Sequence, residues 1–444
     1  MDPSDLARLH QEHVAQLQRG AGAALEAAGY GAVALHSGTP QLRTRFDDRF
    51  WPLQASPCFQ HWLPLAEPGC VLVVAAGKQP ILMRLRETSF WEAPAPPETD
   101  HFWGPFEVRD IARAQAAKEH LPPGRTAFIG DDLAAAAALG FAEDDVNPAP
   151  LLEALDALRV LKTPYEIACL SEANRRAAPG HELLRAMFAR LDHAELEMHL
   201  AFLAATAQDD AETPYKNIVA LGPHAATLHH VSYAKKPMAA QSLLLDAGAS
   251  FAGYCADITR TWVKGSGAGA TAFAQLVAAV EALQQRLCTS VRSGTPYEEL
   301  HDQSHRFVAE ALREVGVSRL SPDELVSSGI TRAFFPHGLG HALGLVCHDV
   351  GCAIIKPRPD NPWLRNTSVI APRQVFTIEP GIYFIQALLD PLREGKHAAQ
   401  IDWPLVDALA QLGGVRIEDD LVVEAGGIRN LTREQLPTGG GTVI

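Results

Sequence analysis

Acidic residues that lie inside apolar, strand-like runs constrain the fold of this chain more than any other feature of its sequence. Asp246 ends a run of three leucines, Glu379 follows Val-Phe-Thr-Ile, and Glu418 lies in a third such run. Burying a carboxylate is costly unless a positive charge or a metal ion accompanies it. The fold must therefore supply cations to these acids, either from a nearby side chain such as Arg416 or from bound metal.

Asp246 and Asp257 are predicted to approach each other across a β-hairpin. They stand eleven positions apart, each beside a strand-like run, and the glycines at positions 248 and 253 allow the chain to turn between them. Two carboxylates that face each other are destabilising unless a cation lies between them. The alternative is that each aspartate ends a strand and points into water, which the apolar flanks disfavour.

Three histidines follow in a glycine-rich segment, at His337, His341 and His348. The first two stand four positions apart, as in zinc-binding helices, but the glutamate of that motif is absent and two intervening glycines disfavour a helix. An extended segment would instead let His341 and His348 reach one site from different directions. A single histidine is more often structural than a ligand, whereas three in this short segment favour a functional site.

These acids and one of the histidines form a candidate site for two metal ions. The four acids are Asp246, Asp257, Glu379 and Glu418. Their four negative charges would be neutralised by two divalent cations, with His341 as a neutral ligand. Oxygen-rich sites with one imidazole suit Mn²⁺ and also accept Co²⁺ or Zn²⁺. Two such ions share a hydroxide nucleophile and polarise a scissile carbonyl.

The order of these residues and their flanking sequences resemble the pita-bread metallopeptidases, and within them the bacterial prolidases and the organophosphorus acid anhydrolases. The motifs that carry the resemblance are HGLGHALG from His337, CHD from Cys347, EPGIYF from Glu379, GGVRIED from Gly413, and FQHWLP and LKTPYEI in the N-terminal part. The resemblance covers nearly the whole chain. It implies an α/β N-terminal domain, residues 1–150, and an α+β pita-bread catalytic domain, residues 151–444.

Local patterns agree with that division. The sequence Asn-Pro-Ala-Pro, which ends at residue 150, is typical of a boundary. Apolar periodicity predicts helices over residues 6–28, 133–139, 151–159, 163–188, 270–291 and 298–315, and strands over residues 31–35, 71–75 and 127–129. Beyond residue 218 strands dominate. The glycine-rich tail, residues 437–444, is predicted to be disordered.

The resemblance assigns each candidate ligand a place in the metal site. It implies that Asp246 binds one ion and that His341 and Glu379 bind the other. It further implies that Asp257 and Glu418 bridge the two ions.

The resemblance also assigns residues to the substrate. Glu379 would act as general base, and His348 would contact the substrate and shuttle a proton. Arg365 would hold the carboxylate of a dipeptide, and Arg416 would support a ligand carboxylate. The residues that would line or complete the substrate pocket are His229, Tyr215, His337 and, reaching from a neighbouring subunit, Asp48.

The activity implied is that of a prolidase, which hydrolyses dipeptides ending in proline, with phosphotriester hydrolysis as a side activity. Aminopeptidase P, which trims longer peptides, is the nearest alternative. Arg365 favours dipeptides, because its charge matches a carboxylate directly after the proline. A catalytically inactive scaffold and creatinase-like, metal-free chemistry are disfavoured, because all five ligand positions are retained.

Two departures from the family pattern stand close to the site. The usual His-Tyr pair is His229-His230, and the usual Pro-Gly-Met turn before the fourth ligand is Pro-Arg-Gln, with Arg373 in the place of glycine. The first leaves an aromatic contact open. The second leaves the backbone geometry of the turn open.

Composition narrows the partners and the compartment. A formal net charge of −14 disfavours nucleic acid and anionic membranes as partners. No stretch approaches the roughly 20 apolar residues that span a bilayer. The seven cysteines are far apart and form no CxxC pair, which favours a reducing cytoplasm over a disulfide framework. A homodimer is expected only from the resemblance.

Overall fold

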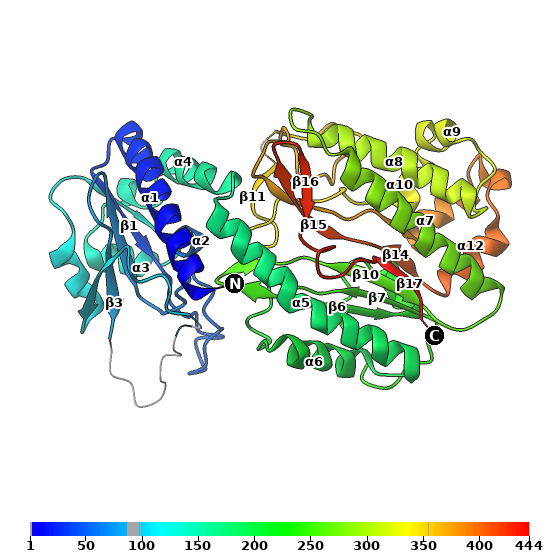
Figure 1. Ribbon diagram of the computed structural model, residues 1–444, viewed down its shortest axis with the longest axis horizontal. Coiled ribbons are helices and arrows are strands. Elements are labelled where there is room, and N and C mark those ends of the chain that lie inside the picture. The colour runs from blue at the N-terminus through cyan, green and yellow to red at the C-terminus, as the bar shows by residue number, and fades with distance from the viewer. Residues whose placement is uncertain (1, 87–96, 98, 354, 444) are drawn as a thin grey trace. The chain divides into compact units, whose positions relative to one another are not determined.

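The computed structural model describes residues 2–86, 97, 99–353 and 355–443. Contacts between residues divide the chain into two compact units, Met1–Cys169 and Leu170–Ile444 (Figure 1). Helix α5, Pro164–Arg190, begins in the first unit and continues into the second. None of the described helices is long and apolar enough to cross a membrane.

The first unit is built on a five-stranded mixed sheet with the strand order β4-β3-β2-β1-β5. The strands are β1 (Ala32–His36), β2 (Val71–Ala75), β3 (Ile81–Leu85), β4 (Glu107–Ile111) and β5 (Thr126–Ile129). Strand β1 pairs antiparallel with β2 and parallel with β5. The three strands predicted in this part of the chain are confirmed.

Helices flank this sheet. They are α1 (Pro3–Ala28), α2 (Pro57–Gln60), α3 (Leu133–Leu139) and α4 (Ala149–Val160), with short 3-10 turns η1 (Ala114–His120) and η2 (Glu143–Asp145). Helix α1 begins at the cap Asp2, whose carboxylate accepts a hydrogen bond from the Ser4 N–H, and it ends at Gly29 with a left-handed φ of 75°. Its apolar face packs against β1 and β2 in one core cluster.

The second unit holds the remaining strands in several small sheets. The strands are β6 (Ile218–Leu221), β7 (Ser242–Asp246), β8 (Ser250–Phe251), β9 (Tyr254–Cys255), β10 (Thr259–Val263), β11 (Val350–Ala353), β12 (Val375–Ile378), β13 (Gly381–Tyr383), β14 (Gly414–Arg416), β15 (Asp419–Glu424), β16 (Gly427–Asn430) and β17 (Gly440–Thr442). The sheets have the orders β17-β10-β7-β6, β12-β15-β16, β13-β14 and β8-β9.

Helices lie along both sides of these strands (Figure 1). Beyond α5 they are α6 (Glu195–Thr206), α7 (Ala268–Ser290), α8 (Tyr297–Glu314), α9 (Pro322–Ser327), α10 (Ile330–Phe334), α11 (Gln386–Arg393) and α12 (Trp403–Ala410), with the 3-10 turns η3 (Gly222–Ala226) and η4 (Ala398–Gln400). Side chains of α5 and α6 pack on β6 and β7 in one cluster, and α7 and α8 form the main core with β12 to β15. The predicted helices are confirmed.

The predicted disorder of the C-terminal tail is wrong. Strand β17 pairs parallel with β10, with Gly440 opposite Thr261. A Cβ atom on Gly440 would lie only 2.0 Å from the Thr261 carbonyl oxygen. Glycine at this position therefore permits the backbones of the two strands to approach closely. The glycine-rich composition of the tail predicts flexibility, whereas this glycine serves a strand contact.

Candidate metal centre

Strand β7 carries Asp246 away from the helices that cover its outer face. Leu243 and Leu245 pack in the cluster formed with α5 and α6, whereas Leu244 packs in a separate cluster. Side chains alternate along a strand, so Asp246 shares the face of Leu244. Its carboxylate Oδ2 accepts a hydrogen bond of 2.7 Å from Arg416 Nη2.

Asp257 enters the same region from the connection between β9 and β10. Strands β7 and β10 pair antiparallel, and β8 and β9 form a short hairpin between them. Asp246 lies opposite Thr259 rather than opposite Asp257, so the predicted hairpin is confirmed with its register shifted by two residues. A Cβ on Gly248 would lie 1.9 Å from the Ala256 carbonyl oxygen, so glycine is required where the two arms meet.

His341 lies in an extended segment, as the two glycines between the histidines predicted. Ala342 forms an antiparallel bridge with Phe376, and the Thr377 N–H donates to the His341 carbonyl at 2.9 Å. A Cβ on Gly340 would lie 2.1 Å from the Thr377 carbonyl oxygen. The histidine segment is thus held against β12, the strand that precedes Glu379.

Glu379 directly follows β12, and Glu418 directly precedes β15, the strand that pairs with β12. The Glu379 N–H donates to the Leu339 carbonyl at 2.8 Å, which ties the acid to the histidine segment. Glu418 lies between β14 and β15, and its N–H donates to the Thr259 carbonyl at 3.1 Å. Its Oε2 accepts a hydrogen bond of 2.7 Å from the Thr259 hydroxyl. Backbone contacts therefore fix both acids before any ion is considered.

The predicted ligands converge on His341. Its Nε2 lies 3.2 Å from Asp257 Oδ2, 3.8 Å from Glu379 Oε1 and 3.9 Å from Glu418 Oε1. Asp246 is close enough for its charge to raise the pKa of Glu379 and Glu418. Five residues distant in sequence therefore form one buried cluster.

Burial and repulsion perturb the two glutamates. Burial raises the pKa of Glu379 to about 7, with the charge of Asp257 adding to the shift and the charge of His341 opposing it. Burial also raises the pKa of Glu418 well above its ordinary value, and repulsion from Asp257 and Glu379 raises it further. Each acid prefers a proton to an unshared negative charge in this setting.

Asp257 and His341 shift in the opposite sense. Burial alone would raise the pKa of Asp257, but the hydrogen bond from His341 overcomes it and the pKa is lowered. Burial alone would lower the pKa of His341, but the hydrogen bond to Asp257 and the charge of that carboxylate raise the pKa to about 9. The protonated imidazole thus supplies the acids with the positive charge that a metal cation would otherwise provide.

The donor set fits divalent metal ions. Arg416 neutralises only one of the four carboxylates directly, through Asp246 Oδ2. Within the part of the chain that the structure describes, the other oxygen, Asp246 Oδ1, is buried and accepts no hydrogen bond. A buried carboxylate oxygen without a donor, beside three more acids and an imidazole, is the arrangement that a hard or borderline divalent cation satisfies.

Two family models match the chain. The model of metallopeptidase family M24 matches residues 168–425, which is more than half of the 444 residues. The chain belongs to metallopeptidase family M24. The model of the N-terminal domain of Xaa-Pro dipeptidase matches residues 8–157. Membership of this family implies divalent metal ions, in agreement with the donor set.

Known proteins resemble the chain over its full length. The Xaa-Pro dipeptidase of Marinobacter nauticus is 42% identical over 442 residues, which cover 98% of this chain and 100% of that protein. The Xaa-Pro dipeptidase of Pseudoalteromonas atlantica is 39% identical over 441 residues, which cover 97% and 98%. These relatives agree with the predicted resemblance to bacterial prolidases.

Solved structures share the fold. Aminopeptidase P from Escherichia coli with the inhibitor Pro-Leu matches with a TM-score of 0.72 at 23% identity, covering 98% of this chain and 95% of that one. Proline aminopeptidase P II from Yersinia pestis matches with a TM-score of 0.71 at 22% identity, covering 96% of each chain. The predicted architecture, an α/β N-terminal domain and a pita-bread catalytic domain, is confirmed.

A hydrogen-bond network centred on Arg416 supports the acidic residues of the cluster. Arg416 donates to Asp246, to the Tyr383 hydroxyl at 3.0 Å through Nη1, and to the Thr259 hydroxyl at 3.2 Å through Nε. Tyr383 also lies 2.9 Å from His337 Nε2. Burial lowers the pKa of His337 to about 3, so that its imidazole is neutral at neutral pH. His337 therefore joins this network through Tyr383, and its Nδ1 also lies 3.8 Å from Glu379 Oε2.

The residues predicted to contact substrate lie around the cluster. The ring of His348 packs edge-on against His341 with centroids 4.4 Å apart, and burial lowers its pKa to about 4. Arg365 and His229 are exposed, and the charge of each contributes to that lowered pKa, which places both near His348. Tyr215 is half-buried, and its pKa is raised well above the ordinary value by burial and by the neighbouring acids.

Asp48 stands apart from this set. It is exposed, in the first unit, whereas the cluster lies wholly in the second. Its predicted role requires a neighbouring subunit and stays a prediction.

Four residues of the site were missed by the sequence predictions. Thr259 connects Arg416 to Glu418, and Tyr383 connects Arg416 to His337. Asp420 accepts a hydrogen bond of 3.1 Å from the Asp257 N–H, and Cys347 Sγ lies 2.9 Å from Asp257 Oδ2. The alternation of side chains along a strand could have identified two of them. Thr259 lies two positions after Asp257, and Asp420 lies two positions after Glu418, on the same strand face as those acids.

Both departures from the family pattern have a structural account. His230 is buried and its Nε2 lies 2.9 Å from Glu195 Oε2, while His224 lies 2.7 Å from Glu195 Oε1. The replacement of tyrosine by His230 therefore supplies a partner for a fully buried acid. Arg373 retains the left-handed backbone that glycine would adopt, with φ of 73°.

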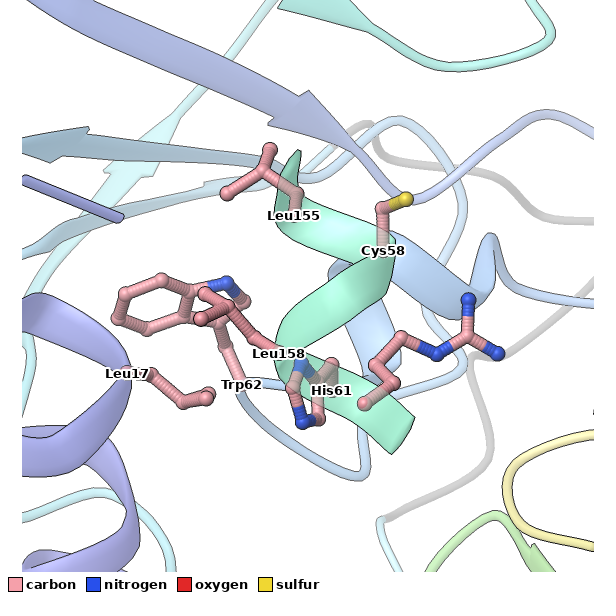
Figure 2. Close-up of a pocket in the computed structure, with 7 residues that line it drawn as sticks. Leu17, Cys58, His61, Trp62, Leu155 and Leu158 are labelled. Carbon is pink, nitrogen blue, oxygen red and sulfur yellow. The ribbon is translucent and has the colours of Figure 1, made fainter. Parts of the chain in front are cut away.

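A small cavity belongs to the unit that does not carry the acids. It has a volume of about 10 Å³, room for one water molecule, and lies in the first unit (Figure 2). Its lining residues are Leu17, Cys58, His61, Trp62, Leu155, Leu158 and Arg159. They include no carboxylate, so the cavity is a packing defect of the first unit rather than a substrate pocket.

Proposed function

We propose that this chain is an Xaa-Pro dipeptidase that binds two divalent metal ions at Asp246, Asp257, His341, Glu379 and Glu418. The observation that carries the proposal is the convergence of Asp257, Glu379 and Glu418 on the His341 imidazole, with the charge of Asp246 close to them. The full-length similarity to Xaa-Pro dipeptidases supports the substrate class. Bound at these residues, the ions supply Lewis acidity, which polarises the scissile carbonyl and activates water.

The chain's own residues position the dipeptide and move the proton. Arg365, exposed beside His348, would pair with the free carboxylate of the C-terminal proline. Glu379 would accept a proton from the attacking water, because its carboxylate lies in the cluster, 3.8 Å from His341 Nε2. His348 is neutral at neutral pH and so would donate a hydrogen bond to the substrate or relay the proton to the leaving amine.

Several finer features belong to the same proposal. Mn²⁺ is proposed as the native ion because oxygen donors predominate. A homodimer, in which Asp48 would reach a neighbouring site, and a division at residue 150 into N-terminal and catalytic domains are also proposed. The reducing cytoplasm remains the predicted compartment. Phosphotriester hydrolysis stays a prediction.

Aminopeptidase P activity is the alternative, and Arg365 distinguishes the two. Where the bound dipeptide shields the guanidinium–carboxylate pair from water, losing one partner costs about 2–5 kcal/mol. Arg365→Ala should therefore lower kcat/KM on Gly-Pro by about one to three powers of ten. Its effect on the amide of Gly-Pro should be small, because that substrate offers the arginine no charge.

The measurement is kcat/KM of wild type and Arg365→Ala on Gly-Pro, its amide and Gly-Pro-Ala. Arg358→Ala is the matched control, an exposed arginine paired with Glu298 and Asp302. A selective loss on Gly-Pro supports the dipeptidase. Faster hydrolysis of the tripeptide than of the dipeptide by wild type would replace it with aminopeptidase P.

A further inference from the structure

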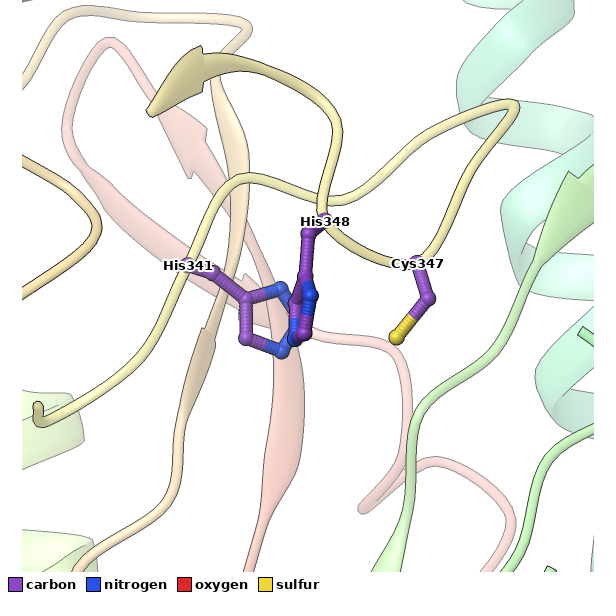
Figure 3. A group of neighbouring side chains, drawn as sticks. All are labelled: His341, Cys347 and His348. Carbon is purple, nitrogen blue, oxygen red and sulfur yellow. The ribbon is translucent and has the colours of Figure 1, made fainter. Parts of the chain in front are cut away.

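A cysteine thiol lies inside the cluster of candidate ligands. Cys347 follows the glycine-rich histidine segment and directly precedes His348. Its thiol donates a hydrogen bond to Asp257, with Sγ 2.9 Å from Oδ2. Figure 3 shows the sulfur pointing toward the imidazoles of His341 and His348. The donor atoms of these three residues all lie within 4.8 Å of one another.

The same carboxylate oxygen links the sulfur to the metal position. Asp257 Oδ2 lies 2.9 Å from Cys347 Sγ and 3.2 Å from His341 Nε2. A nitrogen, an oxygen and a sulfur donor thus surround one point. Zinc ligands lie about 2.0–2.3 Å from their ion, so donors bound to one ion sit about 3–3.5 Å apart, close to these separations.

A second observation points to a cation here independently of the cysteine. Among the described residues, the buried Asp246 Oδ1 accepts no hydrogen bond, although its residue is only 8% exposed. A buried carboxylate oxygen of this kind is satisfied by a hydrogen-bond donor or by a cation. Asp246 lies close to Asp257, the carboxylate to which the thiol of Cys347 donates.

We propose that Cys347 is an additional ligand to the ion held by His341 and Asp257, an inference that rests on the metal-dependent function proposed above. When the ion binds, the S–H bond breaks, the sulfur donates its electron pair to the metal, and the proton passes to solvent. A thiolate is a soft ligand, which favours Zn²⁺, Co²⁺ and Cd²⁺ over Mn²⁺. Cys347 thus makes this centre more thiophilic than five oxygen and nitrogen ligands alone.

A purely structural thiol would behave differently. In that case the S–H group would remain a hydrogen-bond donor to Asp257, and the ion would not contact sulfur. Direct coordination leaves a spectroscopic signature that a hydrogen bond does not, namely thiolate-to-cobalt charge-transfer absorption in the near ultraviolet. Activity alone would not separate the two cases.

The test is a Co²⁺ titration of the full-length, metal-free protein in buffer without added thiols, followed by near-ultraviolet absorption and by cobalt content. The variants are Cys347→Ser, Cys347→Val and the control Cys58→Ser, which alters a cysteine of the first unit. Wild type and Cys58→Ser should develop the charge-transfer band in proportion to bound cobalt. Cys347→Ser and Cys347→Val should bind cobalt without it.

A second measurement uses wild type and Cys347→Val in competition between Cd²⁺ and Mn²⁺. Removing the sulfur should lower the preference for Cd²⁺ by at least about tenfold, the effect of one lost ligand contact worth about 1.4 kcal/mol. Cobalt bound by wild type without the band, or an unchanged Cd²⁺ preference, would overturn the role of Cys347 and leave the dipeptidase proposal intact. Failure of wild type to bind cobalt at all would overturn both.

Discussion

At the residue scale, Arg373 shows how the family turn survives the loss of its glycine. Its φ of 73° lies in the left-handed region, which costs a residue with a Cβ roughly 1–2 kcal/mol. The turn is held from outside, because the Arg373 N–H donates to the Val423 carbonyl at 2.7 Å and β15 is part of the sheet with β12. The strained turn directly precedes β12, the strand that positions Glu379.

This strain predicts a stabilising substitution. Arg373→Gly should raise the free energy of unfolding by about 1 kcal/mol, because glycine adopts the observed φ without a steric cost. Arg373→Ala keeps the Cβ and should give no gain. Urea unfolding of the three proteins measures the difference. Equal stability of the glycine and alanine variants would show that the turn stores no strain.

Single residues also mark where sequence reasoning stops. The clustering of the four acids could be predicted because each carboxylate stands in an apolar run that excludes water, and that of His341 because it belongs to a glycine-rich segment with three histidines. Cys347 could not, because a thiol in a loop has no periodic signal and its contact with Asp257 depends on tertiary packing. The register of Asp257 was missed for a related reason: the β8–β9 hairpin between the arms offsets it by two positions.

At the element scale, strand β15 distributes three successive acids by alternation. Glu418 and Asp420 face the metal centre, where Asp420 accepts hydrogen bonds from the Asp257 N–H and from Asn174. Asp419 points the other way and pairs with the buried Arg260 at 3.0 Å. The three successive acids Glu-Asp-Asp thus contribute to two sites on opposite faces of the strand, although in the sequence they form one acidic run.

The C-terminal strand gives the prediction at this scale. Gly440→Ala should destabilise the second unit by about 1–3 kcal/mol, because its Cβ would collide with the Thr261 carbonyl and displace β17. Gly426→Ala is the matched control, since a Cβ there meets nothing within 4 Å. Thermal unfolding monitors both variants. If Gly440→Ala melted with wild type, β17 would not be a stable part of the sheet.

Elements were more predictable than their connections. The helices α1, α3, α4, α5, α7 and α8 and the strands β1, β2 and β5 follow from periodicity, whereas β3 and β4 were not predicted. The cap of α5 follows from Thr163 and Glu166, whose N–H and carboxylate lie 2.8 Å apart. The tail was mispredicted because composition describes local freedom, whereas pairing with β10 is a long-range contact. Small sheets with such long-range partners leave no mark in local sequence.

At the scale of the whole molecule, buried neutral histidines occur in both units. Burial lowers the pKa of His10, His181 and His305 to about 3 and that of His13 and His301 to about 4. In the unfolded chain these imidazoles would titrate near their ordinary pKa of about 6.5. Between pH 6.5 and 4 the unfolded state therefore binds more protons than the folded state.

The sign of the pH dependence follows. Stability should fall as pH falls through this window, because protons are taken up on unfolding. Each histidine that stays neutral when folded contributes about 2 kcal/mol to the loss between pH 7 and pH 5. Urea unfolding at the two pH values measures the slope. His305→Phe, which removes one such group, should reduce the loss, and an unchanged slope would mean that His305 is protonated in the folded state.

The central claim is that the clustered acids hold two ions, and metal content per chain tests it most directly. Purified wild type reconstituted with Mn²⁺ should contain two ions per chain. Asp257→Asn should lose most of this metal together with activity, because the aspartate is predicted to bridge both ions. Asp323→Asn, an exposed aspartate whose side chain is 79% accessible, should keep both. Two tightly bound ions and normal turnover in Asp257→Asn would contradict the assigned site.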